Sequence, residues 1–86
     1  MEVMKEKVLQ AVADSTRLLL LREIRRKKAI CACELPPIAK VSQPAVSQHL
    51  KVLLGAGLVE MKREGVKRIY SVSAKGEKVL RDVERW

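Results

Sequence analysis

The stretch Ser42–Val59, SQPAVSQHLKVLLGAGLV, decides the fold because it encodes a helix with two unlike faces. Its apolar residues Val46, Leu50 and Leu53 recur at helical spacing, so one side of the helix faces a core. The helical rotation brings four polar side chains together on the opposite side: Gln43, Ser47, Gln48 and Lys51. A face that only had to be soluble would more often carry Glu and Lys, whereas short amide and hydroxyl groups suit hydrogen bonds to the edges of bases.

The residues before this helix predict a shorter helix and a tight turn. Two adjacent prolines begin at Pro36, and proline is tolerated only in the first turn of a helix, so we expect a short helix from about Pro36 to Lys40. Ser42 then provides an N-cap for the next helix, and Gly55–Gly57 ends it. Two helices joined by so short a connection form a helix-turn-helix.

The residues after the helix change their hydrophobic period and predict a β-hairpin. The segments LVEMKRE (58–64) and VKRIYSVS (66–73) flank a turn expected at Glu64–Gly65. Four cationic residues surround its tip: Lys62, Arg63, Lys67 and Arg68. A helix-turn-helix followed by a basic hairpin is the pattern of a winged helix.

The remaining segments complete the order of elements. We expect helices over residues 3–13, from Asp14 or Ser15 to about Lys28, and over residues 74–86, with an extended segment at residues 29–33. The basic run Arg25–Lys28 suits either the end of its helix or contact with phosphates. The predicted fold class is mainly α with a β-hairpin wing (α+β), in the order helix, helix, short strand, helix, helix, strand, strand, helix.

Composition limits the number of domains and the class of partner. The 86 residues form a single domain (1–86), which buries only about 60–65% of its unfolded surface, so a partner surface is expected. Eighteen Lys and Arg against 10 Asp and Glu give a net charge of +8, which suits nucleic acid or an acidic membrane surface. No helix combines a wide apolar face with a basic face and bulky aromatic residues, which argues against a membrane role.

The N-terminal segment MEVMKEKV lacks the apolar stretch of a signal peptide, and no apolar run approaches a spanning length. We therefore expect a cytoplasmic protein whose two cysteines, Cys31 and Cys33, are thiols. The sequence has no catalytic arrangement of Ser, His and Asp, no Gly-rich phosphate loop and no inward pair of carboxylates, so we expect no enzymatic activity. The single histidine, His49, lies at the margin of the core face and is interpreted as a packing residue.

Four segments in order give the chain a resemblance to a known family: ADSTRLLLLREI (13–24), ICACEL (30–35), VSQPAVSQHLKVLLGAGLV (41–59) and REGVKRIYSVS (63–73). Together they resemble the arsenic-repressor type (ArsR/SmtB) family of winged-helix repressors, over about Val12 to Ser73. The resemblance implies a homodimeric transcriptional repressor that binds a pseudo-palindromic operator in double-stranded DNA. It also implies an inducer, often a metal ion, that lowers the affinity for DNA.

By position, the resemblance assigns base contacts to Gln43, Ser47 and Gln48, which the helical rotation independently places outward with Lys51. It also implies that Ser42 caps the helix close to a phosphate, and that the four cations of the hairpin contact the backbone or the minor groove. In this fold the terminal helices, here about 2–13 and 74–86, usually pair across a two-fold axis. The apolar residues expected in this contact are Val8, Val12, Val79, Leu80, Val83 and Trp86. The same stripe could instead cover the core of a single chain.

The cysteine pair departs from the pattern of metal-sensing members. Such members commonly carry a third cysteine three residues after the second, where this chain has Pro36, and the last segment lacks the His ligands of the other common site. No cofactor is certain. Cys31 and Cys33 alone suit a soft metal ion held by two thiolates or an oxidation switch, and the alternative is that they are small buried hydrophobic residues.

A second class of function is a winged-helix protein–protein or architectural module of a transcription or chromatin assembly. Such modules turn the recognition face into an interface, which would favour apolar residues at positions 43, 47 and 48. The polar residues found there favour DNA.

Overall fold

The helix expected from the opening stretch is present as α4 (Gln43–Gly55), and its partner in the helix-turn-helix is α3 (Leu35–Ala39). The computed structural model describes the backbone of residues 3–85 and the side chains of residues 6–85. The other elements are α1 (Val3–Ala13), α2 (Ser15–Lys27), β1 (Ile30–Cys31), the 3-10 turn η1 (Ala32–Glu34), β2 (Val59–Glu64), β3 (Lys67–Val72) and α5 (Ala74–Glu84). The chain is a winged helix in the predicted order.

The core lies between α2, α4 and the sheet, and it is aliphatic. Val46, Leu50 and Leu53 of α4 are between 0% and 2% exposed, so the inward face predicted from their spacing is confirmed. They pack with Leu20, Leu21, Ile24, Leu35, Leu58, Tyr70 and Leu80. Helix α2 contacts each of the other four helices and β3, and therefore forms the centre of the domain.

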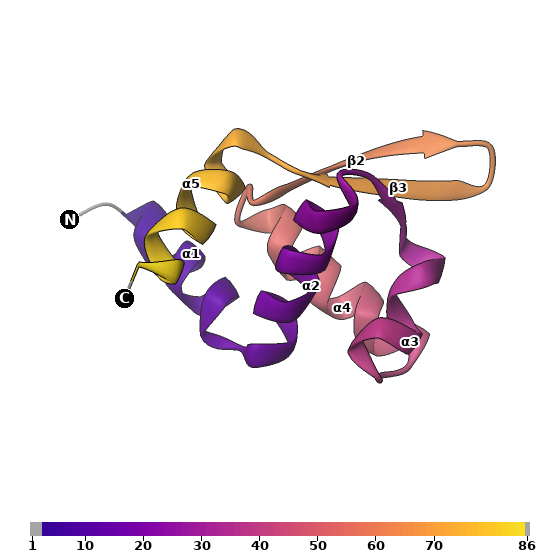
Figure 1. Ribbon diagram of the computed structural model, residues 1–86, viewed down its shortest axis with the longest axis horizontal. Coiled ribbons are helices and arrows are strands. Elements are labelled where there is room, and N and C mark those ends of the chain that lie inside the picture. Colours follow the sequence, from indigo (N-terminus) through magenta and orange to yellow (C-terminus); the bar gives the residue numbers. More distant parts are fainter. Residues whose placement is uncertain (1–2, 86) are drawn as a thin grey trace.

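The sheet has three antiparallel strands in the order β1-β3-β2. Strand β1 pairs with β3 through only two residues, with Ile30 opposite Tyr70 and Cys31 opposite Ile69. Strands β2 and β3 stay paired out to Glu64 and Lys67, so their ends continue beyond the third strand. Figure 1 shows this hairpin reaching out from the body of the chain.

Side-chain caps fix the starts of three helices. The N–H of Arg17 donates to Asp14 Oδ1 at 3.0 Å, which makes Asp14 the cap of α2. Ser42 Oγ accepts from the N–H of Ala45 at 3.3 Å, as expected for the start of α4. Ser73 Oγ accepts from the N–H of Gly76 at 2.9 Å and donates to the carbonyl of Gly57 at 2.7 Å. These bonds satisfy amides that have no partner within their own helix.

The structure corrects two local predictions. Residues 29–33 are not all extended, because the N–H of Cys33 donates to Cys31 Sγ at 3.3 Å and the chain turns into η1 after Cys31. The turn of the hairpin lies at Gly65–Val66, one residue later than expected, because Glu64 still pairs with Lys67. Gly65 supplies the positive φ of 63° that this two-residue turn requires.

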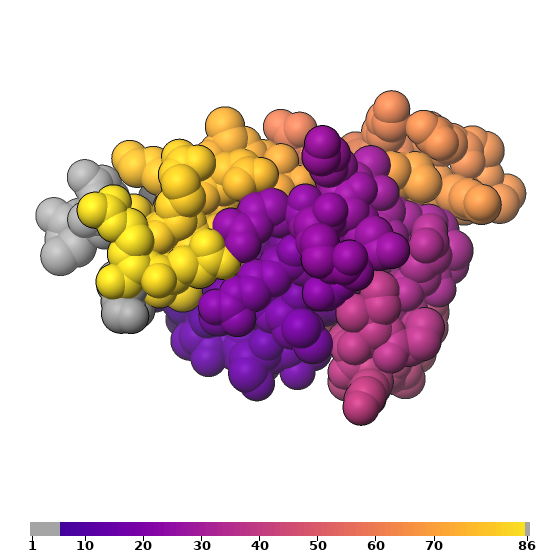
Figure 2. Space-filling view, viewed as in Figure 1, coloured from indigo at the N-terminus to yellow at the C-terminus, as the bar shows by residue number. Residues whose placement is uncertain are grey.

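The elements are distributed along a long axis, with extents of 39 × 23 × 21 Å. Figure 1 shows the tip of the hairpin and α3 at one end of this axis, and α1, α5 and both termini at the other end. In the space-filling view of Figure 2, α5 lies beside the first two helices while the hairpin projects at the opposite end. Among the described residues, no helix has the length and apolarity needed to span a membrane.

Candidate nucleic-acid interface

The outward face of α4 is open to solvent along its whole length. Gln43, Ser47, Gln48 and Lys51 are all exposed, as predicted from the helical rotation. Their helix is fixed from behind by three buried side chains, so the polar groups project from a rigid support. The N–H of Gln43 and the positive end of the helix dipole also lie at the start of α4 beside Ser42, which favours contact with an anionic backbone.

Arg17 of α2, which no sequence pattern singled out, links the end of α1 to α4. The Arg17 guanidinium donates from Nε to the carbonyl of Ala11 at 3.0 Å and from Nη2 to the carbonyl of Gln10 at 2.9 Å, and so satisfies the end of α1. Its Nη1 lies 3.4 Å from Nδ1 of His49, which is half-buried on α4. His49 is therefore half-buried at the margin of the core face, as predicted, where it contacts Arg17.

The hairpin adds a cationic surface at the same end of the molecule as α3. Lys62, Arg63, Lys67 and Arg68 are all exposed, in agreement with their predicted place around the tip. Lys62 Nζ lies 3.5 Å from Glu64 Oε2, so one cation offsets the carboxylate nearest the turn. Within the part of the chain that the structure describes, the other three cations form no ion pair and remain available to phosphates.

The two cysteines lie between the sheet and α3, and both are free thiols. Cys31 is 6% exposed on β1, whereas Cys33 in η1 is open to solvent. Hydrogen bonds from the Cys33 thiol and backbone N–H lower the pKa of Cys31, with Lys67 adding a smaller effect. The same thiol–thiol hydrogen bond raises the pKa of Cys33.

The donor set around this pair does not fit a closed metal site. Among residues 6–85, no group of three or more His, Cys, Asp or Glu side chains is arranged to hold an ion. Pro36, where a third thiol would be needed, lies in the first turn of α3. The chemistry that remains for Cys31 and Cys33 is that of two thiols alone.

The predicted dimer residues gather at the opposite end of the molecule, with one correction. Val8, Val12, Val79 and Val83 are half-buried, so each has apolar surface that a partner could cover. Leu80 is 0% exposed and belongs to the core of the single chain, because α5 turns this residue inward against α2 and the sheet. Trp86 lies outside the described residues. Leu9, which the sequence did not single out, is 54% exposed on α1.

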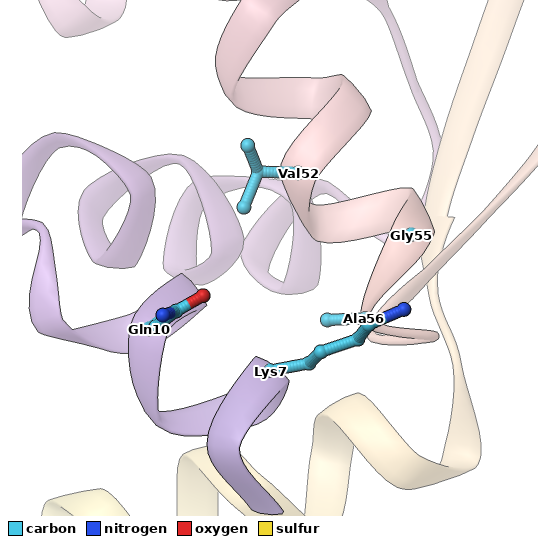
Figure 3. Close-up of a pocket in the computed structure, with 5 residues that line it drawn as sticks. All are labelled: Lys7, Gln10, Val52, Gly55 and Ala56. Atoms are coloured by element: carbon cyan, nitrogen blue, oxygen red, sulfur yellow. The ribbon is translucent and has the colours of Figure 1, made fainter. Parts of the chain in front are cut away.

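A shallow hollow of about 210 Å³ lies between α1 and the end of α4. Figure 3 shows Lys7 and Gln10 on one side of it, and Val52, Gly55 and Ala56 on the other. None of the residues predicted to contact DNA lines this hollow. It is therefore separate from the outward polar face of α4 and from the hairpin.

Comparison with known proteins agrees with this geometry. Residues 14–61 match the model of the family described as "Bacterial regulatory protein, arsR family". The arsenical resistance operon repressor of Bacillus subtilis (strain 168) is 34% identical over 68 residues, which are 79% of this chain and 65% of that protein. The HTH-type transcriptional regulator Rv2034 of Mycobacterium tuberculosis is 40% identical over 78 residues, which are 90% of this chain and 72% of that protein.

The same fold is found in a solved structure of HlyU from Vibrio cholerae N16961, with a TM-score of 0.85 and 28% sequence identity. The superposition covers 99% of this chain and 96% of HlyU. The family match covers the helix-turn-helix, with the polar face of α4, and the first part of the wing, and it ends at Met61 before the four cations of the hairpin. The chain therefore belongs to the ArsR family of DNA-binding transcriptional regulators.

Proposed function

We propose that this chain is a repressor that binds a pseudo-palindromic site in double-stranded DNA as a homodimer. The observation that carries the proposal is the outward face of α4, where Gln43, Ser47, Gln48 and Lys51 are exposed. The opposite face of the same helix is buried in the core. Amide groups such as those of Gln43 and Gln48 can form paired hydrogen bonds with adenine in the major groove. The exposed cations of the hairpin provide contacts with the backbone that do not depend on sequence.

The homodimer is supported by the distribution of surfaces along the molecule. Each chain offers one recognition helix, and one helix reads too few base pairs to define an operator. The half-buried valines of α1 and α5 lie at the end away from the hairpin, so pairing through them would leave both recognition helices free. Two-fold symmetry would place the half-sites roughly one turn of DNA apart, about 34–36 Å.

Selection of bound duplexes from random DNA tests this proposal. The expected product is a site with two inverted half-sites, and Gln43→Ala should relax the preference at particular positions in both halves. The exposed Lys78 on α5 provides a control, because Lys78→Ala changes a polar residue away from α4 and the hairpin and should leave the selected site unchanged. Enrichment of no sequence, or of a single half-site without symmetry, would contradict the proposal.

The alternative, a protein–protein module, predicts a different result in the same experiment. It requires the α4 face to bind an apolar or mixed protein surface, and no duplex would then be enriched. Gln43, Ser47, Gln48 and Lys51 expose amides, a hydroxyl and an amine, which favours DNA, and the same helix also exposes Val52 and Leu54 at 39% and 40%.

Release by a thiol-seeking ion or an oxidant would have to act through Cys31 and Cys33. Because β1 pairs with β3 and η1 leads directly into α3, a change at these thiols would reach both the wing and the helix-turn-helix. The 6% exposure of Cys31 supports the other interpretation, in which it is a small hydrophobic residue of the core.

A titration of the protein–DNA complex with soft metal ions, and separately with an oxidant of thiols, distinguishes an inducer site at Cys31 and Cys33 from a structural role. Release from the original protein, together with retention by the Cys31→Ser/Cys33→Ser variant, would assign an inducer role to the pair. Retention by both proteins would leave Cys31 as a core residue and Cys33, which is exposed, without a sensing role.

A further inference from the structure

The tip of the hairpin carries an apolar side chain that the fold does not use. Val66 is 97% exposed, far more than the other large hydrophobic residues of the described chain that lie at the surface. It occupies the second position of the two-residue turn between Glu64 and Lys67. Figure 1 shows this turn as the outermost point of the hairpin.

Neither the turn nor the core requires valine at this position. Gly65 supplies the positive φ, and Val66 is not among the residues with positive φ, so most side chains would fit there. Turn positions favour Gly, Asn, Asp and Ser, which hydrogen-bond locally or adopt unusual backbone angles. A β-branched apolar side chain brings neither property, and it gains no burial in the free chain.

A single exposed apolar side chain is common on protein surfaces, so the surroundings of Val66 carry the argument. Arg63, Lys67 and Arg68 are exposed and belong to the two residue pairs of the hairpin that adjoin the turn. Neither of these pairs is next to β1 in the sheet. The contact between Lys62 Nζ and Glu64 Oε2, at 3.5 Å, offsets the one carboxylate beside the turn. The tip is therefore an apolar point surrounded by free cations.

This arrangement matches the DNA minor groove better than a protein surface. The groove has phosphates along both rims, where the cations would bind, and apolar deoxyribose walls between them, where a small aliphatic side chain would fit. A stable protein interface buries roughly 1,000 Å² or more, and Val66 has only Gly65 and charged residues beside it. The surroundings thus favour DNA over a second copy or another protein.

We propose that Val66 enters the minor groove at the edge of the bound site and makes the wing a reader of base composition there. This inference rests on the proposed function as a DNA-binding protein. An apolar side chain against the groove floor leaves the guanine 2-amino group without a hydrogen-bond partner, whereas A·T pairs present no such donor. The wing should therefore select A·T pairs over G·C pairs beneath Val66.

Three duplexes test this selection, built on a bound site found by selection and differing only in the base pairs outside the half-sites: A·T, G·C and inosine·C. Inosine·C has the major groove of G·C but lacks the 2-amino group. The original protein should bind the A·T and inosine·C duplexes alike and the G·C duplex about three- to tenfold more weakly. Equal weakening by inosine·C and G·C would overturn the proposal, because the contact would then lie in the major groove.

The variant Val66→Thr keeps the shape of the side chain and adds a hydroxyl. It should bind the A·T duplex about three- to tenfold more weakly, lose most of the discrimination against G·C, and keep its melting temperature and the salt dependence of binding. Val52→Thr makes the same change at an exposed valine of the hollow between α1 and α4 and should leave the discrimination intact. Unchanged binding and discrimination in Val66→Thr would overturn the proposal.

Two other outcomes are distinguishable from these. Dissociation of a DNA-free oligomer in Val66→Thr, measured by sedimentation, would make Val66 a protein contact and would overturn the proposal. Failure of the original protein to bind any duplex would reject the proposed function itself, before Val66 is considered.

Discussion

Lys40 adopts the left-handed conformation, with φ 59° and ψ 39°, at the turn between α3 and α4. This conformation brings the Cβ of an L-residue close to its own backbone, which is why glycine commonly occupies such a position at the end of a helix. The backbone conformation shows that lysine is accommodated here at some cost in stability.

Replacing Lys40 by glycine should therefore stabilise the fold. Relief of the left-handed strain outweighs the greater freedom of glycine in the unfolded chain, and we expect Lys40→Gly to raise the free energy of unfolding by about 0.5–1 kcal/mol. Urea denaturation measures the change. Lys40→Ala is the control, since it removes the charge but keeps the Cβ; an equal gain in this variant would show that charge, not backbone conformation, is responsible.

For single residues, the sequence predicted burial or exposure where this follows from local periodicity. It did not predict a residue whose role depends on contacts with distant parts of the chain. The buried and exposed faces of α4 follow from spacing alone, so Val46 and Ser47 were placed correctly. Arg17 was missed because one of its contacts is with His49, 32 positions away, and no local pattern encodes that contact.

Helix α5 is attached to the rest of the chain at both of its ends. At its start, a Cβ built on Gly76 would clash with the carbonyl oxygen of Leu58, so the helix rests directly on the backbone. At its other end, the Arg25 guanidinium makes a bidentate contact with the Glu84 carboxylate, and Arg22 Nε lies 3.7 Å from Glu84 Oε2. The orientation of α5 is thereby set by the monomer.

Adding a methyl group at the first of these points should displace the helix. Gly76→Ala is expected to lower the free energy of unfolding by about 1–3 kcal/mol, because the carbonyl of Leu58 belongs to the backbone and must shift. Gly55 provides a matched control at the end of α4, where a Cβ would meet nothing within 4 Å. Gly55→Ala should be neutral or stabilising by up to about 1 kcal/mol. If thermal unfolding ranked the two variants in the opposite order, the close packing of α5 would be disproved.

The elements themselves were largely predictable, because each has its own local signal. Ser42, Gly65 and the basic hairpin residues mark the ends and turns of α4, β2 and β3. The pairing of β1 with β3 was not predictable, since two residues carry too little periodicity and Tyr70 lies 40 positions beyond Ile30. The 3-10 turn was missed for a related reason: it depends on a hydrogen bond to the Cys31 sulfur.

For the whole molecule, two carboxylates predict how stability depends on pH. The backbone N–H of Arg17 is the main cause of a lowered pKa of Asp14, and the Arg25 guanidinium is the main cause of a lowered pKa of Glu84. Both groups bind protons more readily when the chain is unfolded. The stability that Asp14 and Glu84 contribute to the folded chain is therefore complete at a pH above their ordinary pKa values of 3.8 and 4.5. This stability is lost as the pH falls further.

The two contributions should be modest, because the side chains of Asp14 and Glu84 are 37% and 36% exposed and solvent screens them. Denaturation midpoints measured from pH 7 to pH 3 should fall at the acid end, and the fall should be shallower in the Asp14→Asn/Glu84→Gln variant. An identical fall in both proteins would assign the acid sensitivity to other groups.

Assembly is also a property of the whole molecule, and we expect a dimer in solution. Val83→Glu would place a charge in the expected contact between two copies of the chain, which α1 and α5 form. Sedimentation at micromolar concentration should therefore change from dimer to monomer. Val52→Glu is the matched control at an exposed valine on α4 and should leave the dimer intact. A monomeric original protein, both free and on DNA, would contradict the expectation.

The most direct test of sequence-specific binding through α4 is the affinity of the protein for its selected site and for a scrambled duplex, measured across a range of salt concentrations. Gln48→Ala should reduce the discrimination between the two duplexes by about 1–3 kcal/mol and leave the salt dependence unchanged. Arg63→Ala should weaken binding to both duplexes alike and reduce the slope of log affinity against log salt by about one. A change of sequence preference in Arg63→Ala but not in Gln48→Ala would contradict the assignment of base contacts to α4.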